Sequence, residues 1–179
     1  MYQKRSSAFT IVELLIVIVV IAILAAITIM AYNGIQSRGR DSQRAQDIQT
    51  IAKALELYYI DKGEYPNGTN YTPGSTAING SWSTTADGSW SNLATVLKPY
   101  ISSLPTSPGA NSATPAINGG NNYDYVGVSN TNYCNSSKGQ TYLLAYKLES
   151  GVTNQTVGTC GGTQLGYYGN GASNYRVVK

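Results

Sequence analysis

An apolar run near the N-terminus constrains this chain more than any other feature of its sequence. Residues 11–31 read IVELLIVIVVIAILAAITIMA, and only Glu13 and Thr28 interrupt the hydrophobic side chains. About 20 helical residues of this kind span the hydrocarbon core of a bilayer. A secretory signal peptide has a shorter apolar core, of about 7 to 15 residues. We therefore predict that the run is retained as a membrane-spanning helix.

A helical pattern continues beyond the apolar run. A helix from Phe9 to Asp61 would be about 80 Å long, so its apolar half needs a membrane or partner helices. Gly34 and Gly39 each weaken a helix by about 1 kcal/mol relative to alanine, so a kink or local melting would be easiest there. Apolar residues recur at steps of three and four in the second half, and charged residues lie off this stripe. The stripe is Ala45, Ile48, Ile51, Ala52, Leu55, Tyr58 and Tyr59, and the charged residues off it are Arg44, Asp47, Lys53 and Glu56.

The rest of the chain predicts a small α+β domain. Gly63 and Pro66 mark the end of the long helix, and the polar residues 67–91 predict an exposed loop. A short helix is predicted within residues 91–100. Alternating aromatic and β-branched residues predict strands at 123–128, 142–149 and 175–178. We expect an antiparallel sheet that packs on the second half of the long helix.

Two cysteines, Cys134 and Cys160, lie in the last third of the chain and lack the spacing of a redox or zinc motif. A structural disulfide outside the cytoplasm is the simplest use, and it would stabilise the fold by roughly 3 to 4 kcal/mol. Two free buried thiols are the alternative. The position of the cysteines indicates that the C-terminal part of the chain faces the outside of the cell.

Composition argues against most enzyme and cofactor classes. The chain has no histidine, only 12% charged residues and a net charge of +3. Familiar proton-transfer and metal chemistry therefore lacks its commonest residue, and we expect neither catalysis nor a cofactor. The basic residues are scattered, so no nucleic-acid surface is evident. Asp87, Asp124 and Glu149 are too dispersed to indicate a calcium site. The 15 tyrosines are expected to pack the sheet and its rim.

Glu13 is the anomaly in the apolar run. A carboxylate in the apolar end of a spanning helix is costly unless it lies near the interface or has a partner. One interpretation is that Glu13 reaches the lipid headgroups from the start of the helix, where the helix dipole favours a negative charge. The residues around it point to another interpretation.

Residues 4–17, KRSSAFTIVELLIV, resemble the N-terminal signal of type IV prepilins and of the pseudopilins of type II secretion. That family has a short basic leader, a small residue, and then Phe-Thr-Leu-x-Glu at the start of an apolar helix. The resemblance implies that a prepilin peptidase cuts between Ala8 and Phe9 on the cytoplasmic side and that Phe9 is then N-methylated. The sequence departs from the family at Ala8, where glycine is usual, and at Ile11, where leucine is common.

A weaker match lies in residues 57–66, LYYIDKGEYP, which look like the helix end of Gram-positive-type pilins and major pseudopilins. Together the two matches imply the type IV pilin fold, an α+β architecture in which a long N-terminal helix packs on a small antiparallel sheet. The implied organisation is a leader, a transmembrane or filament-core half-helix, an amphipathic half-helix and an exported globular domain. These segments are residues 1–8, 9–32, 33–63 and 64–179.

The function implied by the resemblance is structural. The subunits would associate through their N-terminal helices into a helical filament, in which Glu13 meets the Phe9 ammonium of a neighbour. The implied partners are a prepilin peptidase, an assembly platform, an ATPase and the inner membrane. The product would be a cell-surface pilus for adhesion, twitching motility or DNA uptake. The alternatives are a minor pilin or a periplasmic type II secretion pseudopilin, and, in another class, a single-span anchor for a ligand-binding domain.

Overall fold

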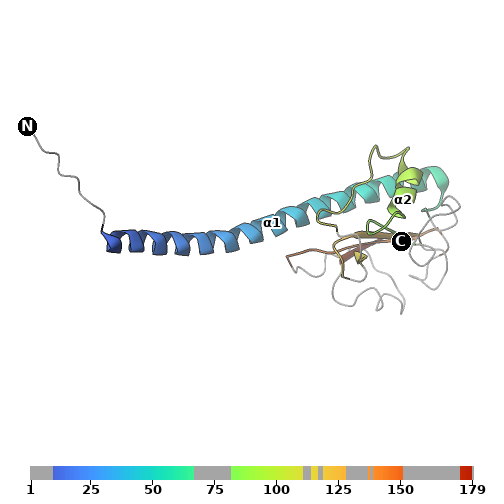
Figure 1. Cartoon of the computed structure of the whole chain (residues 1–179). Coiled ribbons are helices and arrows are strands. Elements are labelled where there is room, and N and C mark those ends of the chain that lie inside the picture. The colour runs from blue at the N-terminus through green and yellow to red at the C-terminus, as the bar shows by residue number, and fades with distance from the viewer. Residues whose placement is uncertain are drawn as a thin grey trace, which may run out of the picture. The chain divides into compact units, whose positions relative to one another are not determined.

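The structure is a computed structural model that describes residues 10–66, 82–110, 114–116, 119–127, 137, 139–150 and 174–178. Chain contacts divide the protein into an N-terminal unit, residues 1–38, and a C-terminal unit, residues 39–179. The elements follow one another along the chain as labelled in Figure 1. They are α1 (Ile11–Lys62), β1 (Trp82–Thr84), α2 (Trp90–Leu97), β2 (Tyr123–Gly127), β3 (Tyr142–Tyr146) and β4 (Asn174–Val178).

The long helix α1 has 52 residues and continues through Gly34 and Gly39 as one element. It ends where Gly63 takes a positive φ of 74° and donates its N–H to the Tyr59 carbonyl at 2.7 Å. Glycine adopts this left-handed conformation without the steric cost of a Cβ atom, so it ends helices readily. The predicted long helix and its stop are therefore confirmed.

The sheet has four strands in the order β1-β2-β3-β4, and all of its neighbours are antiparallel. The central pair aligns Tyr125 with Leu144, and each strand follows its predecessor in sequence. The three predicted strands are confirmed with slightly different limits, as is the short helix, which is α2. The prediction of an exposed loop over residues 67–91 is wrong in its described part, because β1 lies there, α2 begins at Trp90, and Ser83, Thr84 and Ser89 are buried. A three-residue edge strand is too short to show a periodic pattern.

One hydrophobic core joins α1, α2 and the sheet within the C-terminal unit. The second half of α1 places Ile51 and Leu55 in this core with no exposed surface, and α2 adds Leu93 and Leu97 in the same state. The fold class predicted from the sequence, a long helix packed with an antiparallel sheet, is confirmed. The sheet contributes mainly aromatic rings from one face, as expected for tyrosine: Tyr123, Tyr125, Tyr142, Leu144 and Tyr146.

Three further glycines have positive φ angles, Gly139, Gly109 and Gly119, and the space around Gly139 differs from that around Gly109. At Gly139, with φ of 75°, a Cβ atom would lie 2.7 Å from the Cβ of Glu64. The Gly139 carbonyl accepts the N–H of Tyr65 at 2.7 Å. At Gly109, with φ of 71°, the nearest atom would be 3.8 Å away. The first position is therefore restricted by both conformation and space, and the second by conformation alone.

Candidate assembly site

Thr10 and Glu13 cap the start of α1. The Glu13 carboxylate oxygen Oε2 accepts the backbone N–H of Thr10 at 2.8 Å and its hydroxyl at 2.7 Å. In return, the Thr10 hydroxyl oxygen accepts the backbone N–H of Glu13 at 3.2 Å. This reciprocal pattern is a capping box, which satisfies two backbone donors that a helix start leaves free. The sequence signal for it, threonine followed three residues later by glutamate, was present but was not used in the sequence analysis.

The capping box gives Glu13 a partner in its own chain. Within the described residues, no hydrogen bond involves the second carboxylate oxygen, Oε1. The carboxylate therefore keeps an open side although Thr10 occupies the other. The contact with a neighbour's Phe9 stays a prediction, as does the cut between Ala8 and Phe9, because both residues lie outside the described ones. Cys134 and Cys160 also lie outside them, so the disulfide stays a prediction too.

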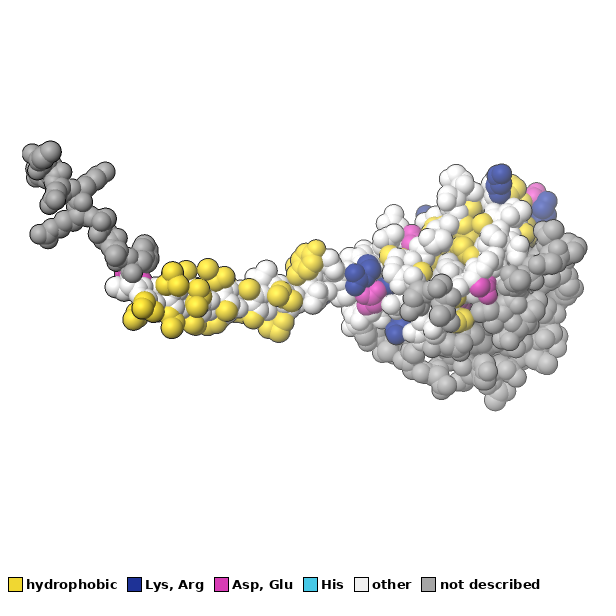
Figure 2. Space-filling model, viewed as in Figure 1, with side chains coloured by type: hydrophobic (Ala, Val, Ile, Leu, Met, Phe, Trp, Pro, Cys, Tyr) yellow, Lys and Arg dark blue, Asp and Glu magenta, His cyan; other side chains and the backbone are white. Residues whose placement is uncertain are grey.

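The large apolar side chains from Ile11 onward are exposed. Ile11 is 85% exposed, and even Val19, the least exposed large hydrophobic residue of this stretch, is 47% exposed. Figure 2 shows these hydrophobic side chains, in yellow, over the surface of the first part of α1. The helix is long and apolar enough to cross a membrane by length and composition. An apolar surface of this extent is unstable in water and requires lipid or other helices around it.

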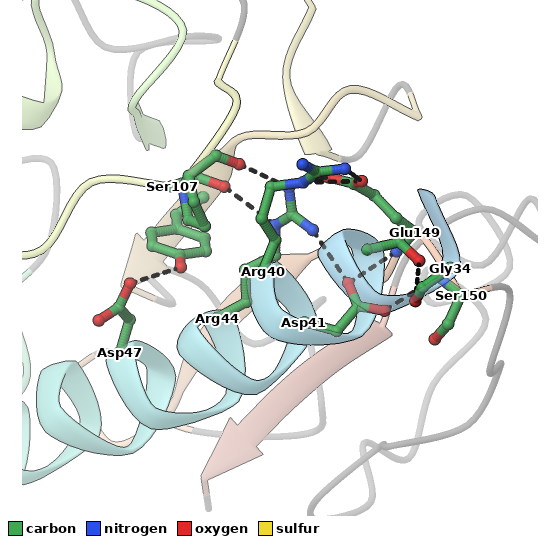
Figure 3. A network of polar contacts seen from close by, with 11 residues as sticks. Gly34, Arg40, Asp41, Arg44, Asp47, Ser107, Glu149 and Ser150 are labelled. Carbon is green, nitrogen blue, oxygen red and sulfur yellow. Dashed lines mark hydrogen bonds and ion pairs between the residues drawn. The ribbon is translucent and has the colours of Figure 1, made fainter. Parts of the chain in front are cut away.

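A second polar cluster holds the beginning of the C-terminal unit together, and we call its residues Arg40, Asp41, Arg44 and Glu149 the clamp (Figure 3). Arg44 is completely buried. Its guanidinium group donates to Asp41 at 2.9 Å, to Glu149 at 2.5 Å and to the Pro108 carbonyl at 2.6 Å. Arg40 donates to both carboxylate oxygens of Glu149. The clamp thus joins one turn of α1 to two segments that are distant in sequence.

The acidic partners of the clamp are held in their charged form. Burial alone would raise the pKa of Asp41, but hydrogen bonds from Ser150, from the Glu149 backbone and from Arg44 bring this pKa below its usual value. Hydrogen bonds from Arg40 lower the pKa of Glu149, and Arg44 adds to this effect. Each carboxylate has two or more donors, which is what a partly buried charge requires.

Arg44 is buried, so the prediction that it lies off the buried stripe of α1 is wrong. The centre of the stripe, from Ile48 to Tyr58, is buried as predicted. The buried face also includes Asp41 and Arg44, which bind Glu149. Periodicity treats a charged residue as an exposed one, so it cannot detect a charge that is buried with its counter-charges. The available signal was the close spacing of Arg40, Asp41 and Arg44 in a chain with few charges.

Among the residues that the structure describes, no group of three or more His, Cys, Asp or Glu side chains lies together as a metal site would require. The carboxylates of the clamp are instead bound by arginine side chains and by backbone N–H groups. The two features that remain, the capping box with its apolar helix and the clamp, are suited to assembly and to structure.

Comparison with known proteins agrees with the N-terminal features. Residues 3–29 match the family described as the prokaryotic N-terminal methylation motif. The chain is 32% identical over 66 residues to type II secretion system core protein G of Aeromonas hydrophila, which covers 37% of this chain and 46% of that protein. It is 30% identical over 69 residues to the type IV major pilin protein PilA of Myxococcus xanthus, covering 38% of this chain and 31% of that protein.

A third relative is the fimbrial protein EcpC of Eikenella corrodens, which is 33% identical over 82 residues, 46% of this chain and 54% of that protein. The chain thus spans between about a third and about half of the lengths of these curated relatives. No solved structure matches the chain. The chain carries the prepilin-type methylation motif and has type IV pilins, fimbrial proteins and a type II secretion core protein among its relatives.

Proposed function

We propose that this chain is a structural subunit of a pilus or pilus-like filament, inserted in the membrane as a precursor and assembled through its N-terminal helix. The observation that carries the proposal is the exposed apolar surface of α1, which begins at Ile11, directly after Thr10 of the capping box. Such a surface suits a bilayer before assembly and a bundle of identical helices afterwards. The relatives named above support a structural function and give no support to an enzymatic one.

Processing would create the charge that Glu13 needs. A cut between Ala8 and Phe9 by a prepilin peptidase frees an ammonium group at Phe9, which N-methylation leaves positive. The open side of the Glu13 carboxylate can then accept that ammonium from a neighbouring subunit, while its other oxygen keeps the capping box. An apolar surrounding makes an unpaired charge costly, so only the register that brings the two charges together is favourable.

The further parts of the proposal concern the surroundings of the filament. The C-terminal unit lies outside the cytoplasm, where Cys134 and Cys160 form a disulfide, and an assembly platform and an ATPase build the filament. We favour a cell-surface pilus for adhesion, twitching motility or DNA uptake. A minor pilin or a type II secretion pseudopilin is the alternative within the same class, and a type II secretion system core protein of Aeromonas hydrophila is among the relatives.

A membrane-anchored binding domain is the second candidate function. A surface groove of about 560 Å³ in the C-terminal unit favours it, a volume within the range of ligand sites. The groove lies beside α2 and is lined by side chains that include Thr85, Asp87, Ser91 and Lys98. Such a domain would need no cut before Phe9 and no partner for Glu13, which distinguishes it from the first candidate.

The test combines processing and assembly. The full chain is co-expressed with a prepilin peptidase and an assembly system, extracted from membranes, and analysed by intact mass and N-terminal sequencing. We expect a methylated Phe9 as the first residue. An intact Met1, or a cut beyond Ala22, would instead support the membrane-anchored binding domain.

Two variants separate the two uses of Glu13. Glu13→Gln removes the charge but keeps an oxygen that can accept the Thr10 hydrogen bonds, so we expect an intact helix start and no filaments. Thr10→Ala removes the hydroxyl of the capping box and keeps the charge, so filaments should persist. Filament yield by electron microscopy and helix content by circular dichroism are the readouts. Filaments from Glu13→Gln at the wild-type yield would refute the assembly role of the charge.

A further inference from the structure

The groove beside α2 is built from one face of that helix and from the segment that follows it. Trp90, Ala94 and Lys98 line it at steps of four residues, so they share one side of α2 and of its C-terminal end. Most of the remaining lining comes from residues 101–106. A hydrogen bond joins the two parts, since Trp90 Nε1 donates to the Pro105 carbonyl at 3.0 Å. The packing of α2 against the next segment therefore fixes the groove.

The lining combines buried apolar side chains with exposed hydroxyl groups. Trp90 and Leu104 are buried, whereas Ser102, Ser103 and Thr106 are exposed. No hydrogen bond of the described residues uses these three hydroxyl groups, so each can donate one bond to a ligand and accept others. A sugar ring has apolar C–H faces and hydroxyl groups around its edge. Such a ring matches both parts of this lining.

Two opposite charges lie at the two ends of α2 within the lining. Asp87 precedes α2 and Lys98 follows it, with about 12 Å of helix between them. One oxygen of Asp87 already accepts the backbone N–H of Ser89 at 2.7 Å. Lys98 is exposed, and its ammonium group makes no hydrogen bond or ion pair with the described residues. A negative group on a ligand would thus be attracted to the Lys98 end and repelled from the Asp87 end.

We propose that this groove binds an acidic oligosaccharide. Its carboxylate contacts the Lys98 ammonium, and its ring hydroxyls bond to the free serine and threonine hydroxyls of the lining. The volume of about 560 Å³ is in the range of small-ligand sites. The inference rests on the ligand-binding function given above as the second candidate, and it holds equally for a C-terminal unit displayed on a filament.

A short peptide is the competing ligand, because its two charged ends also match Asp87 and Lys98. Proteins commonly hold extended peptides along the free edge of a sheet, through backbone hydrogen bonds. No residue of a β-strand is among the described lining residues. The side-chain hydroxyls of the groove therefore favour the sugar.

Saturation-transfer difference NMR of the full chain measures binding, in micelles of a detergent that has no sugar headgroup. The probes are digalacturonic acid and digalactose, which differ in their carboxylates, and tetra-alanine with free ends. We expect both sugars to bind and the acid to bind about three- to tenfold more tightly, as suits one charged contact in a partly exposed site. This preference should disappear in about 1 M salt, which screens charges beyond about 3 Å.

Lys98→Gln tests the position of the carboxylate. We expect the preference for digalacturonic acid to disappear and the binding of digalactose to stay unchanged. The matched control is Lys53→Gln, the same chemical change at an exposed lysine of α1 that does not line the groove, and it should keep the preference. Loss of the preference in both variants, or in neither, would overturn the proposal.

Replacing Ser102 and Ser103 together by alanine tests the hydroxyl contacts. The two hydroxyls bond to none of the described residues, so the urea midpoint of unfolding should stay unchanged while both sugars bind at least fivefold more weakly. Unchanged binding in this variant, or a wild-type chain that binds tetra-alanine and neither sugar, would refute the inference. A chain that starts at a methylated Phe9 and forms filaments but binds no sugar would also refute it and would leave the filament proposal intact.

Discussion

Replacing Arg44 by alanine should destabilise the C-terminal unit far more than replacing Arg40, although both guanidinium groups bind Glu149. Arg44 has no exposed side-chain surface, whereas the Arg40 side chain is 38% exposed. Water therefore replaces the lost contacts of Arg40 but does not reach those of Arg44. Exposed ion pairs contribute little, because solvent screens them and long side chains lose entropy when they are fixed.

The cost of Arg44→Ala follows from the groups that the guanidinium leaves behind. The substitution removes donors to Asp41, to Glu149 and to the Pro108 carbonyl, and it leaves a cavity where the buried stem was. Breaking a buried ion pair by removing one partner costs about 3 to 5 kcal/mol. That is a large part of the 5 to 15 kcal/mol with which domains are usually stable. Arg44→Met should cost less than Arg44→Ala, because methionine fills part of the cavity.

Urea denaturation in micelles, followed by tryptophan fluorescence, measures these differences. Trp90 is a suitable reporter because it is buried in the core and its indole N–H donates to the Pro105 carbonyl at 3.0 Å. A loss of about 4 kcal/mol lowers the urea midpoint by about 2 M when the slope is near 2 kcal/mol/M. The midpoint of Arg40→Ala should shift by a small fraction of that. Equal shifts for the two variants would refute the argument that burial decides the contribution of each arginine.

Two other measurements test the fold. The free energy of unfolding of the C-terminal unit should fall as the pH drops from about 5 to 3. The pKa values of Asp41 and Glu149 are lowered in the folded state, so both carboxylates stabilise it at pH values above their ordinary pKa values of 3.8 and 4.5. This contribution is lost when the two carboxylates are protonated. Asp47, whose pKa is raised by burial, acts in the opposite direction but is a single group. An unchanged melting temperature at pH 3.5 and constant ionic strength would contradict the prediction. Gly139→Ala should lower the melting temperature more than Gly109→Ala, since only the first adds a steric overlap to the same backbone strain; equal losses would show that the overlap relaxes freely.

Local patterns predicted most of the secondary structure. The long helix, its stop at Gly63, the short helix and three of the four strands follow from apolar periodicity and from glycine and proline, which act over a few residues. The edge strand β1 was missed because its three residues are too few to show a period and pair with β2, 40 to 44 positions later in the chain. A pairing of that range leaves no trace in the local sequence.

The clamp shows a different limit of sequence reasoning. Arg44 and Glu149 are 105 positions apart, and each alone looks like an ordinary surface charge. Only the folded chain reveals that they share a buried site with Asp41. The capping box, in contrast, was within reach, since Thr10 and Glu13 are three residues apart and match a known local pattern. The range of an interaction along the chain therefore decided which contacts could be predicted.

The capping box and the proposed assembly contact at Glu13 support each other. A carboxylate on a free side chain would lose several rotamers when a neighbour's ammonium binds it, which weakens the contact. The two hydrogen bonds from Thr10 already fix one carboxylate oxygen at the start of α1, and the open oxygen is fixed with it. The helix start also adds a partial positive charge, which is favourable for a negative side chain at this position. The local motif thus orients Glu13 for the ion pair that we propose between subunits, while the charge of Glu13 remains what that pair requires.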